Sequence, residues 1–115
     1  MGVSIYYTCE RNKPLTNEEH RKVTAIINTY NQNFEWADIG ETFCVYEREA
    51  NDAVEVFQGS TKLPFSDDYE IVLQTLSHWL QCLTDIRRAI ADGAWHVHLE
   101  DTDATWDDEA GWHMR

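Results

Sequence analysis

Basic residues are scarce in this sequence, and their scarcity limits the partners that we expect. Nine Lys and Arg stand against 21 Asp and Glu, which gives a formal net charge of −12. Binding to nucleic-acid phosphates or to anionic lipid headgroups requires a basic footprint. The composition therefore predicts a protein that binds neither nucleic acid nor a membrane surface. Long-range attraction favours a basic protein partner instead, although acidity that serves only solubility would give the same composition.

Motifs of enzyme and cofactor sites are also missing. The five Gly residues are scattered singly, so there is no Gly-rich loop to cradle a phosphate group. The sequence contains no GxSxG, P-loop or GxGxxG pattern. We therefore predict a non-enzymatic protein without a cofactor.

Cysteine pairs and long apolar runs are absent as well. Cys9, Cys44 and Cys82 form no CxxC pair, which excludes a zinc ribbon. The amino-terminal residues lack a basic region followed by an apolar run, so we expect no secretory signal. An odd cysteine count without an export signal predicts reduced, mostly buried thiols and a cytoplasmic location. The uncharged run IVLQTLSHWLQCLT is too short and too polar to cross a bilayer.

Two helices are predicted from capping signals and apolar periodicity. Thr16 followed by Glu19 is a capping-box signature that opens the first helix. The second and longer helix begins after Ser66 or Asp67 and is expected to end at Gly93. Its core positions recur at alternating steps of four and three: Val72, Leu76, Trp79, Leu83, Ile86 and Ile90.

Four strands are predicted at residues 3–9, 41–47, 53–59 and 94–100, where β-branched and aromatic residues gather. The resulting order is β-α-β-β-α-β, the ferredoxin-like arrangement of the α+β class. We expect a single domain over 1–115, with one four-stranded antiparallel sheet and both helices on one face. The first and third strands should be central, and the last strand should lie at an edge.

The last strand divides its side chains between the two sheet faces. Trp95, Val97 and Leu99 alternate with His96, His98 and Glu100. We expect the first set to face the helices and the second set to point to the open side of the sheet. Residues 101–115 form an acidic tail that could pack on this open face. Pairing of the open faces of two copies, which would give a ferredoxin-like homodimer with a structural or regulatory role, is the alternative.

Acids and indoles are concentrated at the carboxyl end. From residue 92 onward the chain carries seven acids and one base, which accounts for half of the net charge. Acids interleaved with aromatic rings suit a basic protein partner, because the acids steer the partner and the rings anchor it. Packing of the rings onto their own domain is the competing interpretation. The predicted partner-binding residues are Glu100, Asp101, Asp103, Trp106, Asp107, Asp108, Glu109 and Trp112.

Two sets of residues suggest enzymatic alternatives. His96, His98 and Glu100 are ligand types that can hold a divalent metal, as in a small metal-dependent enzyme. Alternate residues of one strand are about 7 Å apart, however, and metal sites usually draw ligands from several elements. We therefore predict no metal site, with these three residues as the candidates should one exist. Cys82 and His78, four apart on a helix, are the closest nucleophile–base pair.

Several segments carry a resemblance to known proteins. GVSIYY, FCVYE, GSTKLP, CLTDIRRAI and WHVHLED resemble segments of small uncharacterised bacterial proteins over nearly the whole chain. In size, acidity and lack of a catalytic motif, the chain also resembles the immunity proteins of bacterial toxin systems such as contact-dependent growth inhibition. This resemblance implies an antitoxin that occludes the active site of a toxin domain, often a basic nuclease. It assigns no role to any residue, because the class has no shared motif.

Overall fold

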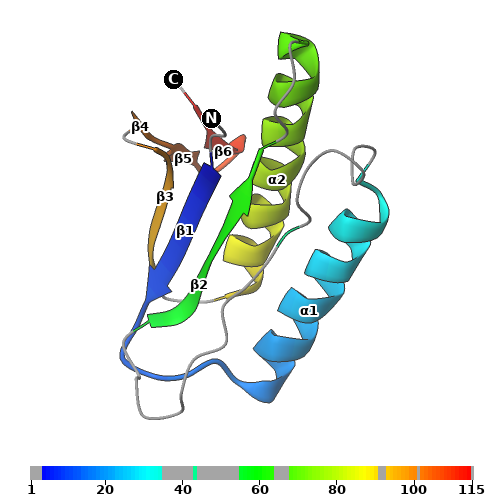
Figure 1. Ribbon diagram of the computed structural model, residues 1–115. Coiled ribbons are helices and arrows are strands. Elements are labelled where there is room, and N and C mark those ends of the chain that lie inside the picture. The colour runs from blue at the N-terminus through cyan, green and yellow to red at the C-terminus, as the bar shows by residue number, and fades with distance from the viewer. Residues whose placement is uncertain are drawn as a thin grey trace.

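The structure is a computed structural model that describes the fold of residues 4–34, 43, 55–63, 68–90, 93–100 and 102–114. Within these ranges the chain forms two helices and six strands (Figure 1). The helices are α1 (Asn17–Gln32) and α2 (Tyr69–Ala89). The strands are β1 (Ser4–Glu10), β2 (Glu55–Lys62), β3 (Ala94–Leu99), β4 (Thr102–Asp103), β5 (Thr105–Asp107) and β6 (Gly111–His113).

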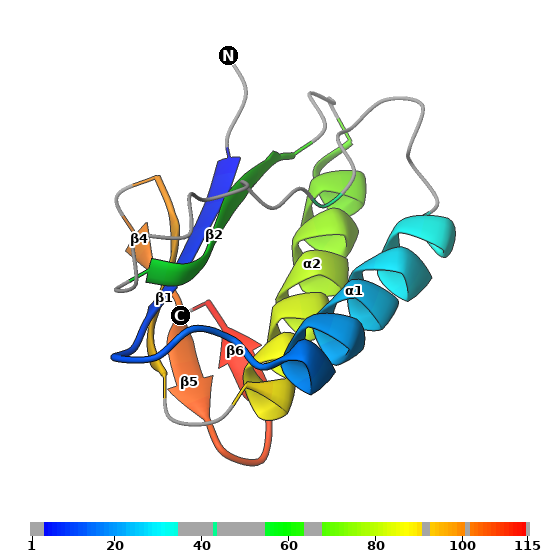
Figure 2. The same ribbon diagram turned by 90° about the horizontal axis from the view of Figure 1, so that it is seen from below.

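One antiparallel sheet and one hairpin contain all the described strands. The sheet has four strands in the order β2-β1-β3-β4, and β5 pairs with β6 separately. Every described pairing is antiparallel. Figure 2 shows α1 and α2 on the same side of the sheet. The protein is therefore an α+β structure with a four-stranded antiparallel sheet and two helices, as the sequence predicted.

The identity and order of the strands differ from the expectation. The strand expected at 41–47 lies outside the described residues, apart from Phe43, which is buried. The fourth strand of the described sheet is instead β4, from the segment expected to be a tail. β3 pairs with β4 as well as with β1, so the expected edge position of the last strand is wrong. A left-handed turn at Glu100, with φ of 53°, causes this by folding the chain back along β3.

The two faces of β1 have different environments. Ile5, Tyr7 and Cys9 are almost completely buried, whereas Tyr6 between them is exposed. Tyr7 stacks on the Phe43 ring, and its hydroxyl shares a 2.8 Å hydrogen bond with the Thr61 hydroxyl. On β3, Val97 is buried and Trp95 and Leu99 pack against the same core, as expected from the period of two.

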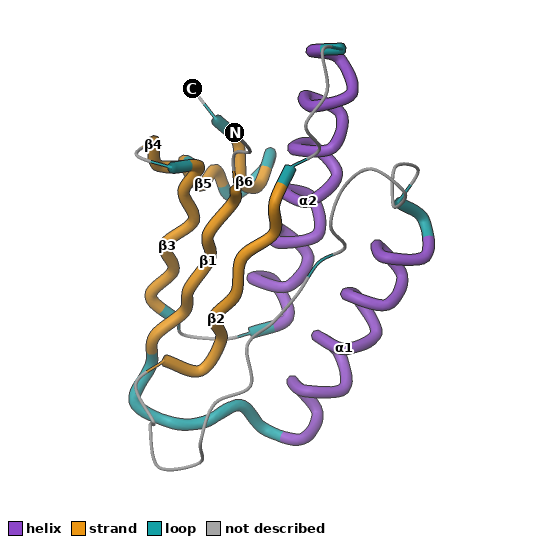
Figure 3. Tube along the Cα trace, in the orientation of Figure 1, coloured by secondary structure: helices purple, strands orange, loops and turns teal. Residues whose placement is uncertain are grey.

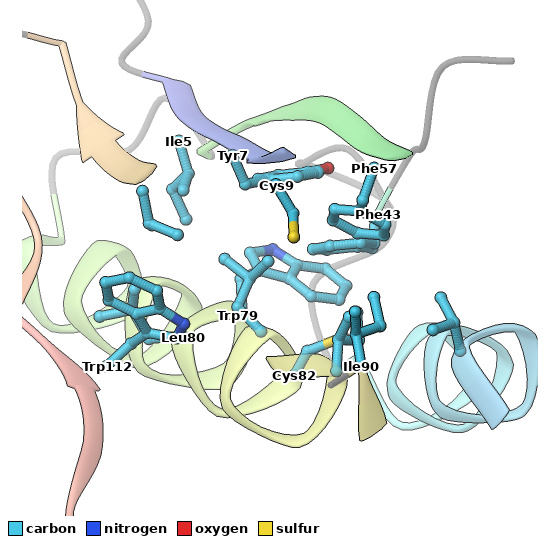
Figure 4. Close-up of a cluster of buried hydrophobic side chains, with 14 of the residues drawn as sticks. Ile5, Tyr7, Cys9, Phe43, Phe57, Trp79, Leu80, Cys82, Ile90 and Trp112 are labelled. Atoms are coloured by element: carbon cyan, nitrogen blue, oxygen red, sulfur yellow. The ribbon is translucent and has the colours of Figure 1, made fainter. Parts of the chain in front are cut away.

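The apolar face of α2 forms the other side of the core. Trp79, Leu83 and Ile86 are completely buried, and Figure 4 shows Trp79 between the helix and the Tyr7 and Cys9 side chains of β1. The predicted stripe is therefore confirmed at these positions. The helix ends before the expected stop at Gly93, because Ile90 is already extended, with φ of −105° and ψ of 117°.

The start of α1 is fixed by a charged pair that is largely hidden from water. The predicted capping box is present: Thr16 accepts a hydrogen bond from the Glu19 N–H, and Glu19 accepts one from the Thr16 N–H. Arg11 is 7% exposed and donates to both carboxylate oxygens of Glu19, at 2.5 and 2.9 Å. It also donates to the carbonyl oxygens of Lys13 and Pro14. Glu19 thus joins the β1–α1 connection to the first turn of the helix.

Figure 3 shows the strands β1, β2 and β3 beside the helices α1 and α2. In the described ranges, no helix is both long enough and apolar enough to cross a membrane.

Glu19→Ala tests the role of the Arg11–Glu19 pair. The substitution leaves the Arg11 guanidinium buried without its carboxylate and removes half of the capping box, so we expect a loss of about 3 kcal/mol in the free energy of unfolding. The matched control is Glu18→Ala, which removes an exposed carboxylate paired with Lys22 and should cost under about 0.5 kcal/mol. Urea unfolding measures both. Equal losses for the two variants would show that Arg11 does not depend on Glu19.

Candidate functional site

The acidic carboxyl-terminal segment is folded in the structure. Trp106 pairs with Trp112 across the β5–β6 hairpin, and the Glu109 N–H donates to Asp107 Oδ1 at 2.9 Å within the turn. Gly111 has a φ of +85°, which a residue with a Cβ adopts only under strain. The backbone of this segment therefore has a fixed path from β4 to β6.

The hairpin is attached to α2, where Trp112 enters the core. Trp112 is 7% exposed, and its backbone N–H donates to Thr84 Oγ1 at 3.0 Å. A Cβ at Gly111 would lie 2.5 Å from Thr84 atoms, so the strand and the helix are in very close contact. Figure 1 shows β6 beside α2. The tail therefore packs on α2, not on the open sheet face, because burial of the Trp112 indole against the helix places it there.

Two arginines of the last turn of α2 contact the hairpin. The Arg87 guanidinium carbon lies 4.2 Å from the centre of the Trp106 ring and 5.1 Å from that of Trp112. Arg88 donates to the carbonyl oxygens of Asp108 and Glu109 at 3.2 and 3.3 Å. Burial lowers the pKa of Arg87, and the nearby Asp108 carboxylate opposes that shift. The contact of these arginines with the tail was not predicted from the sequence, because the partners lie about 20 residues apart in the chain.

The predicted acidic residues that are described remain at the surface: Glu100, Asp103, Asp107, Asp108 and Glu109. Four of them accept an internal hydrogen bond. Glu100 accepts from the Ser4 N–H at 3.2 Å, Asp103 is bonded to His96 Nε2 at 2.8 Å, and Asp108 accepts from Trp106 Nε1 at 2.8 Å. The fourth is Asp107, in the hairpin turn. These bonds restrict the carboxylates to particular positions before any partner arrives.

The two predicted anchors and Asp101 have different outcomes. Trp106 is half-buried, with Arg87 over one face of its ring. Trp112 is a core residue, so its indole is not an exposed anchor in this structure. Asp101 lies outside the described residues.

Of the three candidate metal ligands, His96 and His98 lie together, whereas Glu100 makes a different contact. The His96 and His98 rings stack with centroids 4.7 Å apart, and Tyr6 stacks on His98 at 5.1 Å. The Glu100 carboxylate is engaged with the Ser4 backbone N–H instead. In the described part of the chain, no group of three or more His, Cys, Asp or Glu side chains is arranged to hold a metal ion.

The Cys82–His78 pair has an environment unsuited to nucleophilic catalysis. His78 Nε2 lies 2.8 Å from the Tyr30 carbonyl oxygen, and its ring packs against Phe34 and Trp79. Cys82 is completely buried, and burial together with the nearby Asp85 carboxylate raises its pKa. The thiol therefore stays protonated near neutral pH, whereas a nucleophilic cysteine reacts as the thiolate.

Comparisons with protein-family models, with curated proteins and with solved structures give no match.

The buried thiols predict a loss of stability in alkaline solution. Burial raises the pKa of Cys9 from 9.0 to about 11, and the pKa of Cys82 is also raised. The unfolded chain ionises first, so the free energy of unfolding should fall between about pH 9 and 11, by up to about 1.4 kcal/mol per pH unit for each thiol. Urea unfolding across this range measures the slope. Cys9→Ala should make it shallower, and an unchanged slope would contradict the shift at Cys9.

Gly111→Ala tests the attachment of the hairpin to α2. The new methyl group would overlap Thr84 and strain a backbone at positive φ, so we expect a loss of about 2–4 kcal/mol in the free energy of unfolding. Trp112 should become more exposed, with a red shift of the indole fluorescence. Thr105→Ala, at an exposed position of the same hairpin, is the control and should change stability by about 0.5 kcal/mol or less. Parent-like stability of Gly111→Ala would rule out this packing.

Proposed function

We propose that this protein is a non-enzymatic binding protein that neutralises a basic protein partner, and that the partner is a bacterial toxin domain of the nuclease type. One observation carries the proposal: the acidic segment is folded and fixed, with the carboxylates of Asp103, Asp107, Asp108 and Glu109 exposed along it. We define Glu100 and residues 102–109 as the docking segment. A surface that is ordered before binding loses less conformational entropy when the partner docks.

The chemistry of inhibition follows from the carboxylates. A nuclease binds phosphates through Lys and Arg side chains in a positively charged groove. Carboxylates presented by the docking segment would pair with those cations and occupy the groove. The net charge of −12 would also accelerate the encounter with such a partner at low ionic strength.

Arg87 and Arg88 affect which residues of the carboxyl-terminal segment can contact the partner. They lie against Trp106 and the hairpin carbonyls, so they offset part of the negative charge there. In this proposal the half-buried Trp106 contributes the exposed part of its ring to the interface. Trp112 contributes indirectly, by anchoring the hairpin in the core.

The finer features of the fold and setting remain part of the proposal. The ferredoxin-like order is supported by β1, which has antiparallel neighbours on both sides, and by two helices on one face. It requires the strand at 41–47, which lies outside the described residues. A cytoplasmic location is supported by the buried free thiols of Cys9 and Cys82.

A homodimer through the open sheet face is the second candidate assembly. It is favoured by the exposed Tyr6 ring, which stacks on His98 on that face. Sedimentation at micromolar concentration distinguishes it from a monomer.

Neutralising charges on the docking segment tests the proposed function. The chain is used to capture a basic protein from extracts of its host, and the purified partner is then tested for nuclease activity. We expect stoichiometric inhibition of that activity. Asp107→Asn/Glu109→Gln keeps the shape of both side chains and removes two charges, so association at low salt should slow about tenfold and depend less on salt.

The control places the same charge change elsewhere. Glu18→Gln/Glu70→Gln removes two exposed acids from the helices and should leave the association rate within about twofold of the parent. Equal effects of the two double variants would show that only the overall charge matters, and that the docking segment is not the interface. A partner without nuclease activity would contradict the toxin assignment alone.

A further inference from the structure

The two histidines on the open face of the sheet have defined protonation patterns. His96 Nε2 lies 2.8 Å from the Asp103 carboxylate, which can only accept a hydrogen bond when ionised. His98 Nδ1 lies 2.7 Å from the Glu100 carbonyl oxygen, also an acceptor. Each of these ring nitrogens must therefore carry the proton. In the neutral rings this leaves His96 Nδ1 and His98 Nε2 with lone pairs.

This arrangement is characteristic of histidines that bind a metal ion. A ligating imidazole usually donates its other N–H to a carboxylate or a backbone carbonyl, which fixes the tautomer and raises the basicity of the free nitrogen. His96 has the carboxylate version of this contact and His98 has the carbonyl version. Neither contact is explained by core packing, since His96 is exposed and His98 is only half-buried.

The two rings are close enough to share an ion after a change in side-chain conformation. Their centroids are 4.7 Å apart, and their planes are inclined by 24°. Two nitrogens bound to one tetrahedral zinc ion lie roughly 3.4 Å apart. The lone pairs lie in the ring planes, so the stacked rings must turn before both free nitrogens face one ion. The side chains of His96 and Asp103 are 57% and 72% exposed, so they can turn together and keep their hydrogen bond without moving β3. The neighbouring Tyr6 ring limits the space on the far side of His98.

We propose that His96 and His98 form a two-imidazole site for a divalent transition-metal ion, with Asp103 as the positioning residue of His96 and water at the remaining coordination positions. Imidazole nitrogen selects zinc, copper and nickel over calcium and magnesium, which prefer oxygen ligands. The exposed acids Glu100 and Asp103 create a negative potential that attracts the cation. This inference goes beyond the proposed partner binding and does not depend on it.

Calorimetric titration with Zn²⁺ tests the site on the full chain after removal of any affinity tag. We expect one ion per chain with micromolar affinity. Loss of either ring, in His96→Ala or His98→Ala, should weaken binding at least tenfold. Asp103→Asn should weaken it severalfold while both imidazoles remain, which separates a positioning role from direct ligation.

The control removes the same number of imidazoles elsewhere. His20→Ala/His113→Ala takes away two exposed histidines, on α1 and on β6, and should leave the affinity unchanged. A large excess of Mg²⁺ should not displace the zinc. Zinc binding that survives both His96→Ala and His98→Ala, or that Mg²⁺ abolishes, would overturn the proposal and assign the ion to clustered carboxylates. Absence of zinc binding to the parent chain would overturn it as well.

Discussion

The apolar face of α2 is the constraint on which the other elements depend. Trp79, Leu83 and Ile86 are completely buried, so this face cannot turn toward water without losing several large side chains from the core. The sheet covers the face from one side, and Trp112 of the hairpin packs on the same core. Because one helix supports both, the carboxyl-terminal hairpin is placed by the main core of the protein.

This dependence explains how an acidic segment becomes a fixed surface. Carboxylates repel one another, so a run of acids has little tendency to fold alone. Here the backbone is held at Gly111 and Trp112 by Thr84, and the turn is held by Arg88. The acids stay at the surface because the apolar residues between them are buried. Negative charge is thereby presented in one conformation, which suits binding better than a disordered tail would.

Local patterns in the sequence predicted local structure well, and long-range contacts poorly. The capping box at Thr16, the alternation along β3 and the stripe on α2 depend on neighbours close in sequence, and all three were predicted correctly. The β5–β6 hairpin was missed because its only Gly, Gly111, follows the turn and its stability comes from Thr84 and Arg87, far along the chain. The acids of the docking segment were found from composition, but their internal hydrogen bonds depend on folding.

Asp103 belongs to both proposed sites, and this couples them. It is part of the docking segment, and it is bonded to His96 of the histidine pair. A bound divalent cation would add two positive charges beside the carboxylates that we propose for binding a basic partner. The Coulomb attraction would weaken, most strongly at low ionic strength. Because linkage is reciprocal, a basic partner docked at Asp103 would lower the affinity for the metal by the same factor. The two ligands should therefore compete through charge, even where their contacts do not overlap.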